Sequence, residues 1–217
     1  MAKQETTGAL ETQSAQVRDR LLDAAERLFC EKGFDRTSVR DLTTAANCNI
    51  AAVNYHFGGK GKLYIQMFHR QMHRMMDRHR EVIARLTNTP DATLEDLLRG
   101  VVSQPLKQLE RNDPSSAVMK LMVREVLNQH IGKDEILGDM KNEFFTMLGN
   151  AIRSFYPALS LRNTQMLFFS LDALVIHPVL FSDFYLEVIP DLDIDGIIEH
   201  TVKVAAAGIR AYAEGGD

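Results

Sequence analysis

The sequence predicts an all-α protein of about nine helices. Valine, isoleucine and threonine do not gather in the alternating runs that indicate strands. Apolar residues recur instead at i, i+3, i+4 and i+7, the spacing of an amphipathic helix. Glycine and proline are scarce, 13 and 6 of 217 residues, and they stand at most joints between these segments. With 45% apolar and 25% charged residues, the chain is long enough to bury a substantial core.

The apolar pattern divides the chain into three compact helices, a long connecting helix and five more. The predicted segments are 16–31, two short helices within 38–57, 60–86, 91–111 (kinked or interrupted at Pro105), 115–129, 134–155, 161–182 and 194–213. Residues 1–14 are expected to form a disordered tail. Residues 15–62 are expected to form a helix-turn-helix domain, with the motif at 38–57, and residues 63–217 a ligand-binding and dimerisation domain.

Short polar residues and a glycine mark the boundaries of the first three helices. Gly33 is placed to end the first helix. Ser38 and Asp41 form an S-x-x-D signal that starts the second. Asn47 stands where the turn requires a positive φ, which asparagine tolerates better than most residues, and Asn49 is placed to cap the third helix. The segment therefore predicts a helix, a tight turn and a second short helix.

The charges are unevenly distributed along the chain. The net charge is −4 in total, but residues 1–85 hold 14 Lys and Arg against 10 Asp and Glu, a net +4. The remaining residues hold 11 against 19, a net −8. A basic N-terminal part beside an acidic remainder indicates that only the first part meets a polyanion.

Nothing in the sequence indicates secretion or insertion into a membrane. The first 16 residues are polar and lack an apolar core of the kind found in signal peptides. The longest apolar candidate, 171–181, is interrupted by polar residues and is too short for a membrane span. Cys30 and Cys48 are not spaced as metal ligands and fit a reducing compartment. A cytoplasmic location is expected.

The second helix of the motif has the side chains of a DNA-reading helix. It is almost uncharged, and small residues lie beside hydrogen-bonding ones, which suits close approach to base edges in a major groove. Ala51, Ala52 and Asn54 are the expected base readers, and asparagine is suited to pair with adenine. The expected contacts to phosphate are Thr37, Ser38, Tyr55, His56 and Lys60, with Arg40 reaching phosphate or a guanine edge. The alternative is an ordinary helical hairpin within a bundle.

Two stretches resemble the N-terminal domain of the TetR family of transcriptional regulators. They are Ala24–Leu42, which reads AAERLFCEKGFDRTSVRDL, and Asn54–Phe57 followed by Lys60, Lys62, Leu63 and Tyr64. The resemblance covers about residues 15–75. It implies an all-α homodimer whose first three helices bind DNA and whose later helices bind a small molecule and the partner subunit. By position, it assigns DNA contact to the same nine residues, Thr37, Ser38, Arg40, Ala51, Ala52, Asn54, Tyr55, His56 and Lys60.

The chain departs from the family pattern at three positions of the motif. Asn47 replaces the usual turn glycine, Ile50 stands where a basic or polar residue is common, and Asn54 replaces a frequent tyrosine. The last two departures put the operator sequence in question. The C-terminal half resembles the CecR-like branch of the family at Met122-Val123-Arg124-Glu125.

The C-terminal half is expected to hold an effector pocket and a dimer interface. Ligand sites in helical proteins lie between helices and combine apolar walls with a few polar anchors. The candidate contacts are Arg124, Glu125, Phe144, Phe168, Asp172 and His177. The last two helices are the dimer candidates, because 161–181 is apolar around much of its circumference. The last helix carries a stripe centred on small residues: Ile197, Ile198, Thr201, Val204, Ala205, Gly208, Ile209 and Tyr212.

The sequence therefore predicts a ligand-responsive regulator, a repressor that binds a pseudo-palindromic operator as a dimer and is released by a small molecule. No catalytic motif, cofactor or metal set is recognised, so no enzyme is expected. One alternative is a metal-sensing regulator that uses His69 and His73, which are spaced i, i+4 with His79 nearby. Another is a helical ligand-binding module without a DNA role. The sequence does not identify the effector, the operator or the regulated genes.

Overall fold

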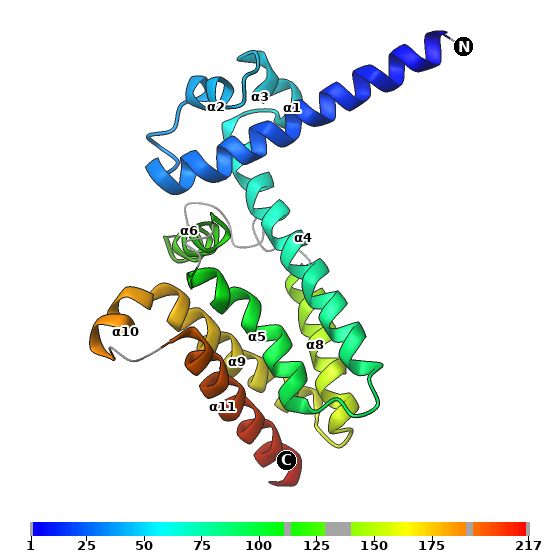
Figure 1. The fold of residues 1–217 in the computed structure, drawn as a ribbon, viewed down its shortest axis with the longest axis vertical. Helices are drawn as coiled ribbons and strands as arrows, with labels where there is room; N and C mark the ends of the chain where they lie inside the picture. The colour runs from blue at the N-terminus through cyan, green and yellow to red at the C-terminus, as the bar shows by residue number, and fades with distance from the viewer. Residues whose placement is uncertain (1, 111–113, 129–139, 190–192, 216–217) are drawn as a thin grey trace. The chain divides into compact units, whose positions relative to one another are not determined.

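A computed structural model describes residues 2–110, 114–128, 140–189 and 193–215, and all the regular structure in these ranges is helical (Figure 1). The helices are α1 (Ala2–Lys32), α2 (Val39–Ala45), α3 (Ala51–Phe57), α4 (Lys60–Thr87), α5 (Leu94–Glu110), α6 (Pro114–Asn128), α8 (Met140–Phe155), α9 (Leu161–Leu180), α10 (Ser182–Val188) and α11 (Ile194–Gly215). The all-α prediction is confirmed.

The helices divide into two compact units. The N-terminal unit comprises residues 1–71 and 121–136, and the C-terminal unit comprises residues 72–120 and 137–217. The first part of α4, up to Gln71, belongs to the N-terminal unit, and the rest belongs to the C-terminal unit. For α6 the order is reversed, because its first part, up to Lys120, belongs to the C-terminal unit. The division therefore differs from the expected boundary after residue 62.

Three helix boundaries differ from those expected. Helix α1 begins at Ala2, so helix occupies the segment for which a disordered tail was predicted. Helix α5 continues through Pro105 to Glu110 without interruption. Helix α9 ends at Leu180, and a separate short helix, α10, follows it at Ser182. Part of the segment expected at 134–155 lies outside the described residues.

An aromatic cluster forms the centre of the N-terminal unit. The ring of Tyr64 in α4 lies 4.7 Å from that of Phe29 and 4.8 Å from that of Phe68, both in edge-on contact. Phe34, which follows the left-handed Gly33, folds back to within 5.8 Å of Phe29 and 4.9 Å of Tyr64. Burial of such rings is a large apolar contribution, and the pairing geometry adds to it. The cluster joins α1 to α4.

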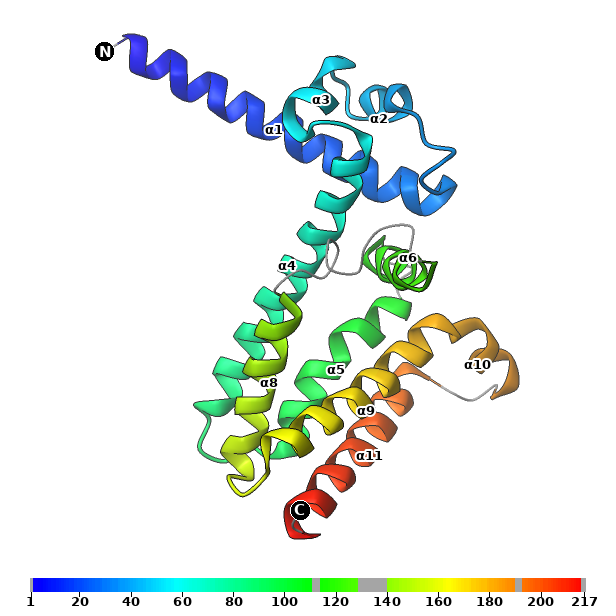
Figure 2. The ribbon, with the colours of Figure 1, turned by 180° about the vertical axis from the view of Figure 1, so that it is seen from behind.

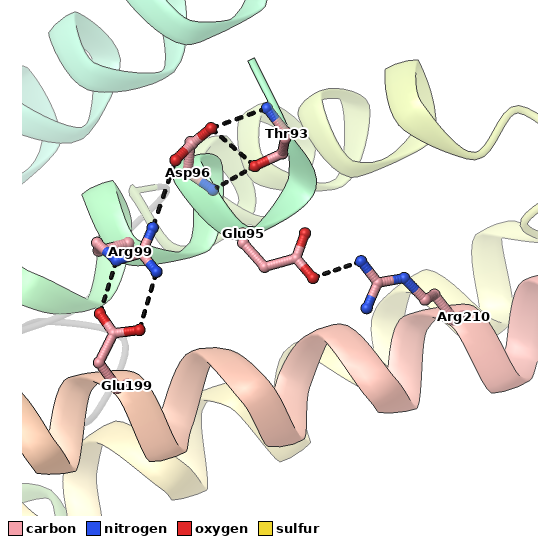
Figure 3. Close-up of polar contacts among 6 residues, drawn as sticks. All are labelled: Thr93, Glu95, Asp96, Arg99, Glu199 and Arg210. Atoms are coloured by element: carbon pink, nitrogen blue, oxygen red, sulfur yellow. Dashed lines mark hydrogen bonds and ion pairs between the residues drawn. The ribbon is translucent and has the colours of Figure 1, made fainter. Parts of the chain in front are cut away.

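Polar contacts flank the packing of α5 against α11 in the C-terminal unit. Helix α11 runs beside α5 and α9 in both views (Figure 1, Figure 2). Arg99 donates from Nε to Glu199 at 2.7 Å and from Nη2 at 2.9 Å, and Arg210 donates to Glu95 (Figure 3). Thr93 and Asp96 cap the start of α5 reciprocally. These contacts join the first two turns of α5 to two places along α11.

A glycine lets α5 lie close to α4. A Cβ added to Gly100 would come within 2.5 Å of Cγ1 of Val82 and 3.2 Å of Cδ1 of Leu86. Because side chains on α4 occupy that space, only glycine fits without a shift of one helix.

Among the described helices, none combines the length and apolarity needed to cross a bilayer.

Candidate nucleic-acid interface

The expected motif folds as α2, a turn and α3. Ser38 accepts a hydrogen bond from the backbone N–H of Asp41 at 3.1 Å, and the Asp41 carboxylate accepts one from the N–H of Ser38 at 2.9 Å. Hydrogen bonds donated to the Asp41 carboxylate by the hydroxyl and the backbone N–H of Ser38 hold the pKa of this carboxyl below its usual range. Asn47 has φ of +48° in the turn, and Asn49 accepts the N–H of Ala51 at 2.9 Å. The predicted capping box, turn residue and cap are confirmed.

Helix α3 has one buried and one exposed face. Val53 and Phe57 are buried against the rest of the N-terminal unit. Ala51 and Asn54 are exposed, and Tyr55 is 80% exposed, an unusual degree for a large aromatic side chain. The structure thus brings the predicted base readers and Tyr55 together on the outward side of α3.

His56 and Ala52 lie at the edge of this exposed face. Both are half-buried. The imidazole of His56 contacts the ring of Tyr55 edge-on, with centroids 4.9 Å apart. His56 stands in the last turn of α3. Ile50, just before α3, is 58% exposed and adds an apolar side chain next to the exposed face of α3.

The predicted role of Thr37 as a phosphate donor is wrong for its side chain. Thr37 is 0% exposed, and its hydroxyl donates towards the carbonyl oxygens of Gly33 at 2.8 Å and Leu28 at 3.2 Å. Hydroxyl groups in buried positions are expected to be satisfied internally, and this one is. Thr37 therefore fixes the loop between α1 and α2 and has no hydroxyl proton to offer a ligand.

Lys60 is partly committed within the protein. Its ammonium group donates to the carbonyl oxygens of Phe34 and Thr37, each at 3.0 Å, and lies 4.1 Å from the centroid of the Phe34 ring. An ammonium group has three donors, so one remains for a phosphate. Ser38 is exposed, but its hydroxyl also donates to the Asp41 carboxylate at 2.7 Å. Arg40 is exposed on α2.

Two arginines of α1 contact residues at the end of α2, in α3 and in α4, and the sequence did not predict either role. Arg20 donates from Nε to the carbonyl oxygen of Ala46, the residue that ends α2, at 3.0 Å. Arg18 donates to Gln66 at 3.2 Å and lies 5.4 Å from the centroid of Phe57. A long polar side chain on the solvent side of a predicted helix gives no sequence signal of such a role.

The six candidate effector contacts lie in three separate places. Arg124 and Glu125 line a hollow of about 680 Å³ in the N-terminal unit, beside Tyr64. Burial and the adjacent Glu125 carboxylate raise the pKa of Tyr64. The phenol oxygen of Tyr64 is buried and lies beside the Glu125 carboxylate.

The other four candidates belong to the C-terminal unit. The rings of Phe144 and Phe168 meet edge-on at 5.5 Å. Asp172 and His177 line a largely apolar hollow of about 910 Å³ formed by α9, α10 and α11. The apolar walls raise the pKa of the Asp172 carboxyl by desolvation, although the side chain is exposed on one side. The Nδ1 of His177 lies 2.7 Å from the hydroxyl oxygen of Tyr185.

The histidines of α4 do not form a metal-binding group in the part of the chain that the structure describes. No cluster of three or more His, Cys, Asp or Glu side chains suited to a metal occurs there. His73 is exposed, whereas His79 is 3% exposed and lies 4.8 Å from the ring of Phe144. Burial lowers the pKa of His79.

Comparison with known proteins agrees with this geometry. Residues 21–67 match the family described as bacterial regulatory proteins, tetR family. The chain is 44% identical over 46 residues to "Probable HTH-type transcriptional regulator YttP" of Bacillus subtilis. The aligned segment covers 21% of this chain and 22% of that protein. It is 38% identical over 50 residues to the "Biofilm operon icaADBC HTH-type negative transcriptional regulator IcaR" of Staphylococcus aureus, 23% and 27% of the two chains. These alignments span about a quarter of each relative.

A solved structure shares the fold over most of this chain. The transcriptional regulator FadR of Bacillus subtilis, solved in complex with stearoyl-CoA, superposes with a TM-score of 0.66 over 87% of this chain and 97% of that chain, at 18% identity. The likeness to FadR at this identity is one of fold. Residues 21–67 thus match a domain of the tetR family, and the structural match shows a shared fold that extends over the C-terminal helices.

Proposed function

We propose that this chain is a ligand-responsive transcriptional repressor that binds a pseudo-palindromic DNA operator as a dimer. The observation that carries the proposal is the exposed face of α3, which holds Ala51, Asn54 and Tyr55. Hydrogen bonds from two arginines of α1 to the residues around the motif support this face. Short side chains on an exposed helix of this motif read base edges in the major groove. The resemblance to IcaR, named as a negative regulator, supports repression over activation.

Dimerisation through α9 and α11 supplies the second recognition helix. Phe169 on α9 is 62% exposed, and Val204 and Tyr212 on α11 are also exposed. Exposed apolar side chains gathered on neighbouring helices indicate a protein interface. A two-fold dimer places two α3 helices about 34–36 Å apart, one turn of DNA. Buried members of the predicted stripe, such as Ile198 and Ala205, pack within the subunit instead.

The effector acts by binding one state of the dimer more tightly than the other. Because α4 contributes residues to both units, a change in the C-terminal unit reaches the DNA-binding helices along one continuous element. FadR binds stearoyl-CoA, so acyl-CoA esters are the first compounds to screen. The six predicted effector contacts and the resemblance to the CecR-like branch stay predictions.

A gel shift with DNA from upstream of the gene tests the DNA-binding proposal. The protein without effector is expected to retard a fragment that contains an inverted repeat, at about 50–100 mM salt. Asn54→Ala is expected to weaken binding to that fragment, while the exposed position keeps the fold intact. Equal binding to an unrelated fragment of the same length would argue against operator recognition.

A further inference from the structure

A basic hollow lies beside the recognition helix in the N-terminal unit. It measures about 320 Å³ and is lined by Arg18, His56, Phe57, Lys62, Ile65 and Gln66. Three helices contribute to it, α1, α3 and α4. Its described lining includes a guanidinium, an ammonium and an imidazole group and no carboxylate. A concave site with only positive ionised groups attracts an anion.

The guanidinium of Arg18 is held in place before any ligand arrives. It donates from Nη2 to Oε1 of Gln66 at 3.2 Å, and its carbon lies 5.4 Å from the centroid of the buried Phe57 ring. Only one of its five N–H groups is used by Gln66, and the guanidinium fork suits phosphate oxygens. A positioned cation loses less conformational entropy on binding than a free one.

Lys62 closes the side of the hollow next to the end of α3. Gly58 has φ of +73°, and a Cβ built on it would lie 3.4 Å from Cδ and 3.6 Å from Nζ of Lys62. The lysine stem therefore lies over Gly58, while the side chain as a whole stays exposed. His56 follows Asn54 and Tyr55 by one turn or less, so the hollow adjoins the proposed base-reading face.

We propose that this hollow binds a phosphate of the DNA backbone next to the bases read by α3, with Arg18 and Lys62 as its principal ligands. The inference rests on the proposed DNA-binding function and adds two phosphate ligands outside the helix-turn-helix motif. Phosphate contacts fix the register of a protein on the duplex, so this site sets how α3 enters the groove. Gln66 and Phe57 act as positioning residues for Arg18.

The test measures how operator affinity depends on salt. Each lost phosphate contact lowers the slope of log Kobs against log salt by about 0.9, so Lys62→Gln is expected to lower it by about 1.8 in a dimer. Arg18→Gln is expected to do the same. Arg27→Gln is the matched control, because it removes an exposed arginine nine residues along α1, on the opposite face of the helix. Melting curves of all three variants check that they fold.

Duplexes with a single uncharged methylphosphonate locate the contact. Wild type is expected to lose affinity when one particular phosphate beside the half-site is neutralised, and Lys62→Gln is expected to be insensitive to that same change. Slopes for Lys62→Gln and Arg18→Gln equal to those of wild type and Arg27→Gln would overturn the inference while the proposed function stands. Wild type that binds no duplex would overturn both.

Titration with inorganic phosphate separates a DNA phosphate from a free anion. Calorimetry of wild type without DNA is expected to show no binding at millimolar phosphate, because the site has only one fixed cation until DNA supplies the remaining contacts. Phosphate binding that is abolished in Lys62→Gln, together with an unchanged DNA salt slope, would assign the hollow to a free anion and overturn the inference.

Discussion

The Nε of Arg20 lies 3.0 Å from the carbonyl oxygen of Ala46, which joins α1 to the end of α2. Ala46 is buried and comes one residue before the left-handed Asn47. The carbonyl at the end of a helix lacks a partner within the helix, and a charged donor satisfies it well. The bond therefore fixes the turn that sets the angle between α2 and α3.

Replacing Arg20 tests the importance of this bond. Arg20→Met keeps the length of the side chain but removes the donor, and is expected to destabilise the protein by about 1 kcal/mol, since the arginine is exposed to water. DNA affinity is expected to fall as well, because the turn becomes less ordered. Urea unfolding and a binding titration measure the two effects. An unchanged midpoint and affinity would show that the bond is dispensable.

Thr37 separates a structural hydroxyl from a DNA-contacting one. Thr37→Val keeps the shape but leaves the carbonyl oxygens of Gly33 and Leu28 without the Thr37 hydroxyl, at an expected cost of about 1–3 kcal/mol. The salt slope for DNA binding is expected to stay at the wild-type value, because no phosphate contact is lost. Thr37→Ser, which keeps the hydroxyl, is the control. A lower salt slope without a loss of stability would restore the phosphate role.

His79 gives the C-terminal unit a dependence on pH. Burial holds the pKa of His79 below the ordinary value of about 6.5, so the unfolded chain binds a proton that the folded chain excludes. Stability is therefore expected to fall as pH drops below about 7, by at most about 1.4 kcal/mol per pH unit, until the folded pKa is reached.

The variant that tests this dependence is His79→Gln, which does not titrate and keeps a donor for the carbonyl oxygen of Val101. Unfolding curves between pH 5 and 8 are expected to show a smaller acid-side loss in this variant. His73→Gln, at an exposed position of α4, is expected to behave as wild type. Identical pH dependence in all three proteins would contradict the assignment.

The exposed apolar surface of α9 and α11 predicts the oligomeric state. Phe169→Glu places a charge where an apolar side chain is 62% exposed, and is expected to convert the dimer to a monomer. Phe169→Leu keeps an apolar surface and is expected to remain dimeric. Sedimentation equilibrium distinguishes the two states. A Phe169→Glu dimer of unchanged affinity would move the interface to another surface.

Much of the DNA-binding motif was predictable because its signals are local. Ser38, Asp41, Asn47 and Asn49 act within two or three residues of themselves, and the structure shows the bonds and the φ that their positions implied. The role predicted for the Thr37 hydroxyl was wrong, because that hydroxyl turns inward to carbonyls four and nine residues away. Spacing in the sequence does not show to which side such a group points.

The long-range contacts were not predictable from the sequence. Arg20 meets Ala46 and Arg18 meets Gln66 across 26 and 48 residues, and a polar residue on a helix surface carries no mark of such a partner. Expected effector residues were likewise distributed among separate hollows, because their spacing along the chain does not fix which helices come together. Glycine at residue 100 illustrates the same limit, since only tertiary packing explains it.

The central claim is that α3 reads DNA through its exposed face. Fluorescence anisotropy with a labelled duplex from the upstream region, at about 100 mM salt, tests it most directly. Wild type is expected to bind the upstream duplex saturably. Asn54→Ala is expected to weaken the binding free energy for the operator by about 1–3 kcal/mol, and to weaken binding to unrelated DNA by less. Wild-type affinity that is equal for the upstream and unrelated duplexes, and unchanged by Asn54→Ala, would contradict it.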